Sequence, residues 1–126
     1  MDDKLIYPEL SYKIIGCLFE VYKKLGCNHR EKYYQKAVSN EFKNQNIKFK
    51  EQVPIKLNYK TSKIGQNFLD FCIEDKIILE IKIGSYFSKN NLEQSLSYLK
   101  ATNMKLGIIA NFTRDGVKHY RVLNLY

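Results

Sequence analysis

Apolar residues recur at helical spacing in the first third of the chain. Between residues 9 and 25 they lie three or four positions apart, which is typical of a helix with one buried face. This face consists of Ile14, Ile15, Leu18, Phe19, Tyr22 and Leu25. Gly26 is suited to end the helix. We predict a second helix from an N-cap at Asn28 to about residue 45, with Glu31 as its capping-box partner. Its inner face consists of Tyr34, Ala37, Val38 and Phe42.

The pattern then changes to the alternation that is typical of strands. Alternating stretches at residues 47–59 and 64–73 are separated by a polar turn at residues 60–63. A second polar turn, Glu74-Asp75-Lys76, leads into the segment Ile77–Ile83, which is rich in β-branched residues. We expect this segment to be a central strand that is buried on both faces.

The last third of the chain predicts one more helix and two more strands. Ser88 or Asn90 can cap a helix that runs through Thr102. Its inward-facing residues are predicted to be Leu92, Leu96 and Leu99. Strands at residues 105–112 and 117–123 follow, joined by a turn that contains Asp115-Gly116. The predicted element order is ααβββαββ, and the predicted fold class is α/β.

Composition narrows the class of protein. A chain of 126 residues suits one compact domain, because two separate cores would each be small, so we expect residues 1–126 to form a single domain. Its apolar stretches are far shorter than the ~20 residues that a membrane helix needs, and the N-terminus is acidic where a signal peptide would be basic. The 3 cysteines have no CxxC spacing, which argues against a disulfide framework or a thiolate zinc site. We expect a cytoplasmic protein with no membrane partner.

The charge of the chain favours a polyanionic partner. Its formal net charge is +8 at pH 7, and six lysines with a single acid lie between Lys43 and Lys63. These lysines have two interpretations of equal weight. They contact nucleic acid, or they form a solvated surface that keeps an edge strand from aggregating.

Two acidic residues, Asp70 and Glu80, each lie in a strand that is otherwise apolar. If Ile73 pairs with Ile77 across a three-residue loop, Asp70 lies opposite Glu80, and Lys82 shares their face of the sheet. A two-residue loop would put the two acids on opposite faces instead. The register of this hairpin therefore decides whether the acids form one site.

Paired carboxylates next to a lysine favour phosphoryl chemistry with a hard cation. Two adjacent carboxylates repel each other unless a positive charge neutralises them, and Mg²⁺ binds carboxylate oxygens while keeping waters for a substrate phosphate. Lys82 is placed to orient an attacking water or to stabilise charge on the phosphate. The alternative is a structural ion pair between Lys82 and Glu80 or Asp70. We weight the functional interpretation more, because a buried ion pair stabilises a fold poorly compared with apolar residues.

These residues resemble a known family. Asp70 followed by Glu80-Ile81-Lys82 is similar to the core motif of the PD-(D/E)xK nuclease superfamily. More narrowly, the chain resembles the small bacterial GxxExxY proteins of that superfamily, from about Leu5 to Val122. The matching segments are Ile14-Ile15-Gly16, Phe19-Glu20-Val21, Leu25-Gly26, Glu31, Tyr34, Val53-Pro54-Ile55, Asp70-Phe71, Glu80-Ile81-Lys82, Gln94 with Tyr98-Leu99-Lys100-Ala101-Thr102, Leu106-Gly107 and Asn111-Phe112. The resemblance implies a restriction-endonuclease-like core, in which helices flank a mixed central sheet.

The resemblance also implies roles for residues outside the strand motif. Asn28 stands where the family motif has Gly, and Asn tolerates left-handed backbone angles well. Glu31 is a candidate third catalytic carboxylate, with the capping box as its equally weighted alternative. Gln94 and Tyr98 resemble the QxxxY element of RecB-like members, and with Tyr34 they are candidates for positioning the substrate. Core packing of Tyr98 is the alternative.

The sequence therefore predicts a Mg²⁺- or Mn²⁺-dependent nuclease. Asp70, Glu80 and the backbone carbonyl of Ile81 would hold the metal, and Lys82 would activate the water. The alternative is a nucleic-acid- or protein-binding module on the same fold without turnover. DNA is favoured over RNA, and a homodimer would let two sites address both strands. Glu20 is interpreted as a surface charge, and Glu41 has no role in this scheme.

Overall fold

The computed structural model describes residues 6–85 and 87–125 and shows an α/β fold with the predicted element order. Residues 1–5, which include the start of the family resemblance and the acidic N-terminus, lie outside the described part. The helices are α1 (Pro8–Leu25), α2 (Glu31–Asn44) and α3 (Lys89–Thr102). The strands are β1 (Phe49–Tyr59), β2 (Ser62–Ile73), β3 (Ile77–Ile83), β4 (Leu106–Thr113) and β5 (Gly116–Leu123). Among the described residues, no helix is long and apolar enough to cross a membrane.

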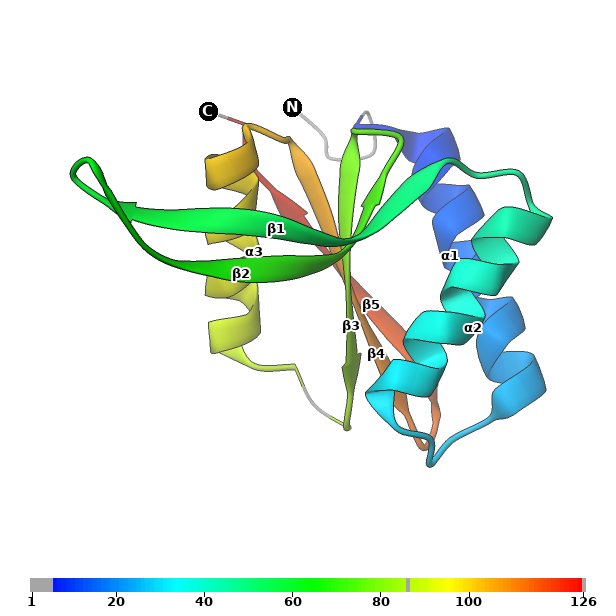
Figure 1. Cartoon of the computed structure of the whole chain (residues 1–126). Coiled ribbons are helices and arrows are strands. Elements are labelled where there is room, and N and C mark those ends of the chain that lie inside the picture. The colour runs from blue at the N-terminus through cyan, green and yellow to red at the C-terminus, as the bar shows by residue number, and fades with distance from the viewer. Residues whose placement is uncertain (1–5, 86, 126) are drawn as a thin grey trace.

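The strands form one mixed sheet in the order β1-β2-β3-β4-β5. Strands β3 and β4 are parallel, and the other neighbouring pairs are antiparallel. A parallel pair needs a crossover connection, and α3 supplies it. Helices α1 and α2 lie on one face of the sheet and α3 on the other (Figure 1). The central strand β3 is buried on both faces as predicted, because both layers of helices cover it.

Each face of the sheet has its own apolar cluster. The larger cluster joins α1 and α2 to residues such as Phe71, Leu79 and Phe112. The smaller joins α3 to the opposite face, and it consists of Ile55, Leu69, Ile78, Tyr98, Leu99, Ile109 and Val122. In the central strand, Leu79 and Ile81 therefore face α1 and α2, whereas Ile78 faces α3. By the alternation of a strand, Glu80 and Lys82 lie on the α3 side of the sheet.

The hairpin of β1 and β2 bends sharply in the middle. Leu69 packs in the α3-side cluster and Phe71 in the cluster of the opposite face, although residues two apart in a regular strand share a face. The pairing of β1 with β2 skips one position here, and Gln52 of β1 has a left-handed φ of 50°. Beyond the bend, the hairpin swings across α3 as a long projecting arm (Figure 1). Asp70 lies at the bend itself.

Three local predictions about the helices are wrong. Helix α2 begins at Glu31 with Arg30 at its N-cap, and Asn28 instead takes a left-handed φ of 67°, so Glu31 is not a capping-box partner. Phe19 is 50% exposed, because α1 buries Val21 and Cys17 instead. Helix α3 buries Ser95, Tyr98 and Leu99, while Leu92 is exposed and Leu96 is half-buried.

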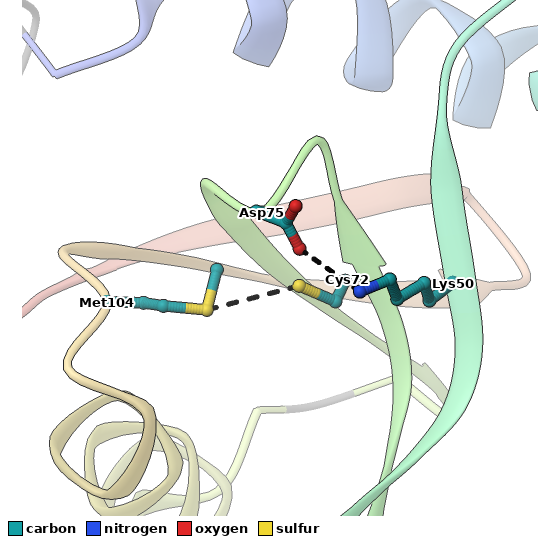
Figure 2. A network of polar contacts seen from close by, with 4 residues as sticks. All are labelled: Lys50, Cys72, Asp75 and Met104. Carbon is teal, nitrogen blue, oxygen red and sulfur yellow. Dashed lines mark hydrogen bonds and ion pairs between the residues drawn. The ribbon is translucent and has the colours of Figure 1, made fainter.

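Polar contacts brace the end of the sheet at which β2 turns into β3. Lys50 of β1 lies 3.6 Å from Asp75 in the turn, and the Sγ of Cys72 lies 4.0 Å from the Sδ of Met104, which follows α3 (Figure 2). The Lys50–Asp75 pair is exposed and adds little stability. All 3 cysteines are free. These contacts lie at the turn that sets the register of the two acidic residues.

Candidate active site

Asp70 and Glu80 lie opposite each other on β2 and β3. Ile73 pairs with Ile77, which confirms the three-residue turn, and the ladder continues as far as Phe71 and Leu79. At the next position, hydrogen bonds from the backbone to the two carboxyl groups replace the backbone–backbone hydrogen bonds of the ladder. The backbone N–H of Ile81 donates to Asp70 Oδ2 at 2.8 Å, and the N–H of Asp70 donates to Glu80 Oε2 at 3.4 Å. Each carboxyl group is thus held by a backbone N–H of the neighbouring strand.

Glu80 is buried with 4% of its surface exposed, and its environment disfavours a negative charge. Burial first, and the neighbouring charge and hydrogen bond of Asp70 second, raise the pKa of Glu80 to about 9, while the ammonium of Lys82 opposes the shift. Without a cation, Glu80 therefore favours its protonated form at neutral pH. A buried carboxyl group whose pKa is shifted by a specific charged neighbour is typical of functional sites.

Lys82 is half-buried and lies on the same face of β3 as Glu80, two residues further along the strand. Its positive charge lowers the pKa of both Glu80 and Glu31, so it interacts electrostatically with both acids. Within residues 6–85 and 87–125, no ion pair of 4.0 Å or less joins Lys82 to an acid. The structure therefore does not show the structural ion pair that was the alternative for this lysine.

Glu31 lies at the start of α2. Burial raises the pKa of Glu31, the charge of Lys82 lowers it, and the charge of Asp70 raises it, so the Glu31 carboxyl feels the charges of both groups. The sequence could not predict this coupling, because Glu31 and Asp70 are far apart in the chain and interact only when α2 packs on the sheet.

Tyr34 holds the start of α2 in place. Its side chain is 1% exposed, its ring stacks on Phe112 at 4.2 Å between centroids, and its hydroxyl donates to the carbonyl of Gly26 at 2.6 Å. A second tyrosine, Tyr22, donates to the carbonyl of Thr113 at 2.7 Å. The role of Tyr34 in positioning the substrate stays a prediction. The observed contacts of Tyr34 anchor the first turn of α2, which begins at Glu31.

Gln94 and Tyr98 lie on the α3 side of the same carboxylates. Burial raises the pKa of the Tyr98 hydroxyl, the charges of Glu80 and Asp70 raise it further, and a side-chain hydrogen bond with Gln94 lowers it. Tyr98 is 5% exposed, as the packing alternative required, whereas Gln94 is exposed. The two interpretations of Tyr98 are compatible, because its ring packs in the core while its hydroxyl lies near the acids.

Asn111 is a site residue for which the sequence analysis assigned no role. It is the register partner of Lys82 in the parallel β3–β4 pair and is 1% exposed. Register partners share a face of the sheet, so Asn111 lies beside Lys82. The signal in the sequence is a polar residue inside the apolar run Leu106–Thr113.

The donor set fits a hard divalent cation in part. Two carboxyl groups and the neighbouring backbone carbonyl of Ile81 are all oxygen ligands, which Mg²⁺ prefers, and a cation would relieve the repulsion that keeps a proton on Glu80. Glu31 does not add a third carboxyl ligand to Asp70 and Glu80. In the described part of the chain, no group of three or more His, Cys, Asp or Glu side chains is close enough to hold a metal ion.

Glu20 and Glu41 lie elsewhere. They line a hollow of about 600 Å³ between α1 and α2, together with Cys17, and none of the candidate site residues borders it. Gln45 donates to Glu41 Oε2 at 3.0 Å. Glu41 thus has a local structural partner, and neither acid belongs to the candidate site.

Comparison with known proteins agrees with this geometry. A family model described as the PD-(D/E)XK nuclease superfamily matches residues 8–122. No curated protein sequence matches the chain. Among solved structures, the crystal structure of SSO0001 has the same fold with a TM-score of 0.52 and 16% identity, covering 92% of this chain and 78% of that one. The family match spans most of the chain, which belongs to the PD-(D/E)XK nuclease superfamily.

Proposed function

We propose that this protein is a Mg²⁺-dependent nuclease that hydrolyses phosphodiester bonds in nucleic acid, with DNA favoured over RNA. The observation that carries the proposal is the buried pair of Asp70 and Glu80 beside Lys82. Two buried carboxyl groups are unfavourable for stability, which favours a functional role. Asp70, Glu80 and Lys82 follow one another along the chain in the order of the superfamily motif.

Asp70, Glu80 and the Ile81 carbonyl would hold Mg²⁺ or Mn²⁺, and divalent metals are typical of this superfamily. A bound divalent cation lowers the pKa of water and stabilises charge on a phosphate. Lys82 orients the attacking water and donates to the phosphate oxygens. Water forms a new bond to phosphorus as the ester P–O bond breaks, which leaves a phosphate monoester and a free hydroxyl.

Glu31 and Asn111 position Lys82 in this scheme. Glu31 attracts the ammonium from α2, as the effect of Lys82 on its pKa indicates, and Asn111 lies beside the lysine on β4. Tyr98 and Gln94 border the carboxylates from α3 and contact the substrate or the carboxylates through their polar groups. We propose membership of the GxxExxY group on the same grounds, because Asn28 has the left-handed φ that a glycine would supply.

Cleavage assays test this proposal. Plasmid DNA, single-stranded DNA and RNA are incubated with Mg²⁺ or Mn²⁺ and with wild type, Glu80→Gln, Lys82→Gln or Glu51→Gln. Glu51 is an exposed acid on β1 and serves as the matched control. We expect wild type and Glu51→Gln to cleave, and Glu80→Gln and Lys82→Gln to lose at least two orders of magnitude in rate. Equal cleavage by all four proteins would refute the assignment.

A binding module without turnover is the second candidate. It is favoured by one observation, that the described residues offer two rather than three carboxylates to a metal. In that case wild type would bind nucleic acid in a salt-dependent manner and would not cleave it under any metal condition.

A further inference from the structure

The β1–β2 hairpin beyond the bend, residues 53–69, is a projecting arm with an unusual composition. From Gln52 to Leu69 the chain contains no Asp or Glu, but it contains three lysines, Lys56, Lys60 and Lys63. The arm extends past α3 and ends in a turn far from the helices (Figure 1). Its charge is therefore uniformly positive along its length.

The arm has one buried face and one exposed face. Val53, Ile55 and Leu69 pack in the cluster under α3. The opposite face is formed by two register pairs, Pro54 with Phe68 and Lys56 with Gln66. All four of these residues are exposed, and Phe68 is 50% exposed. The arm thus presents an aromatic ring and an ammonium group side by side.

Further exposed apolar and basic groups lie on both faces of the arm toward its tip. Leu57, Tyr59 and Ile64 are exposed to 41%, 61% and 68%. The Nζ of Lys60 lies 5.4 Å from the centre of the Tyr59 ring, and the Nζ of Lys63 donates to Gln66 Oε1 at 3.0 Å. A solvated surface that only prevents aggregation would not require this many exposed apolar side chains.

The arm begins next to the candidate active site. Phe68 lies two residues before Asp70, which corresponds to about 7 Å along a strand. The lysines extend away from this point along the arm.

We propose that the arm binds an unpaired stretch of nucleic acid, with one base stacked on Phe68 and the backbone phosphates on Lys56, Lys60 and Lys63. The proposal rests on the proposed function, in which Asp70 and Glu80 act on nucleic acid. The positive charge of the arm, which contains no acidic residue, favours a polyanion. An exposed aromatic ring stacks on a base that is not already stacked between neighbouring bases, as in a single strand. The arm accordingly selects single-stranded or frayed substrate over continuous duplex.

Fluorescence anisotropy tests this proposal in the presence of EDTA, so that no cleavage occurs. A labelled single-stranded oligonucleotide and a duplex of equal length are titrated with wild type, Phe68→Leu and the triple variant K56Q/K60Q/K63Q. Phe19→Leu on α1 is the matched control, since Phe19 is also 50% exposed. A triple variant of exposed lysines on helices, K24Q/K36Q/K100Q, controls for net charge. Thermal unfolding shows that each variant is folded.

We expect wild type to bind the single strand more tightly than the duplex. Phe68→Leu should weaken single-strand binding about tenfold while Phe19→Leu does not, because stacking on the ring is lost. The triple arm variant should lower the slope of log K against log salt by roughly 2, more than the helix variant does. Unchanged binding by both arm variants would overturn the proposal, as would tighter binding of duplex. A wild-type dimer that becomes monomeric in Phe68→Leu would also overturn it, because the arm would then bind a second copy.

The outcome is separable from that of the cleavage assay. Binding that depends on the arm, with no cleavage by any protein, would support the arm and refute the nuclease. Cleavage of single strands by wild type, with unchanged binding and cleavage by the arm variants, would refute the arm and leave the nuclease intact.

Discussion

Replacing Glu80 by Gln should make the metal-free protein more stable at neutral and alkaline pH. The pKa of Glu80 is raised from 4.5 to about 9 in the folded state, by burial first and by Asp70 second. Between these two values the folded chain keeps a proton that the unfolded chain has lost. Unfolding therefore releases a proton, and stability falls as pH rises through this window. Gln cannot ionise, so the variant lacks this loss.

The magnitude follows from the width of the window. Each unit of pKa difference corresponds to about 1.4 kcal/mol. From pH 4.5 to pH 7, ionisation of Glu80 in the unfolded chain lowers the free energy of unfolding of wild type by up to about 3 kcal/mol. Glu80 is 4% exposed, so solvent does not screen the effect. The variant should escape most of this decrease.

Urea denaturation at a series of pH values between 5 and 9, in the presence of EDTA, measures this difference. Wild type, Glu80→Gln and the exposed control Glu51→Gln are compared. Wild type and the control should lose stability as pH rises, and Glu80→Gln should show a flatter profile. Adding Mn²⁺ should stabilise wild type and not Glu80→Gln. Parallel pH profiles for wild type and Glu80→Gln would refute the assignment of a raised pKa to this carboxyl group.

Three further changes have defined outcomes. Tyr34→Phe removes the hydrogen bond to the Gly26 carbonyl and should lower the free energy of unfolding by about 1 kcal/mol in chemical denaturation, whereas an unchanged midpoint would contradict the anchoring role. Asn28→Gly relieves a left-handed φ of 67° and should raise the free energy of unfolding by about 1 kcal/mol or less, seen as a slightly higher melting temperature. A lower melting temperature would contradict the strain at Asn28. The Cys17 thiol, whose pKa burial raises to about 11, should react with a thiol reagent at pH 8 much more slowly than half-buried Cys27, and equal rates in cysteine-to-serine variants of each would contradict this.

The sequence by itself determined the elements and reduced the pairing of the two acids to two possible registers. The apolar periodicity predicted every helix and strand in the observed order, because the period of a buried face is a local property of each element. For Asp70 and Glu80 the sequence left two registers open, because a three-residue turn places the acids on one face and a two-residue turn on opposite faces. The structure pairs Ile73 with Ile77 and so decides for the three-residue turn.

The start of α2 shows where the sequence was insufficient. A capping box at Asn28 satisfied the local pattern, yet the helix starts at Glu31 because Tyr34 is held by Gly26 and Phe112. Similarly, Phe19 and Leu92 belong to apolar stripes but remain exposed, since the surfaces that cover α1 and α3 lie at a different angle. Which part of an apolar face is buried depends on the packing partner and not on the helix alone.

Only the tertiary structure decided the composition of the site. Glu31 of α2 and Tyr98 of α3 both respond to the charge of Asp70, because the two helical layers close on opposite faces of one sheet. The bend at Gln52 and Asp70 is also invisible in the alternation pattern, because a strand that changes face keeps its period on both sides of the break. Long-range packing and a single left-handed residue therefore set the geometry that the local pattern left open.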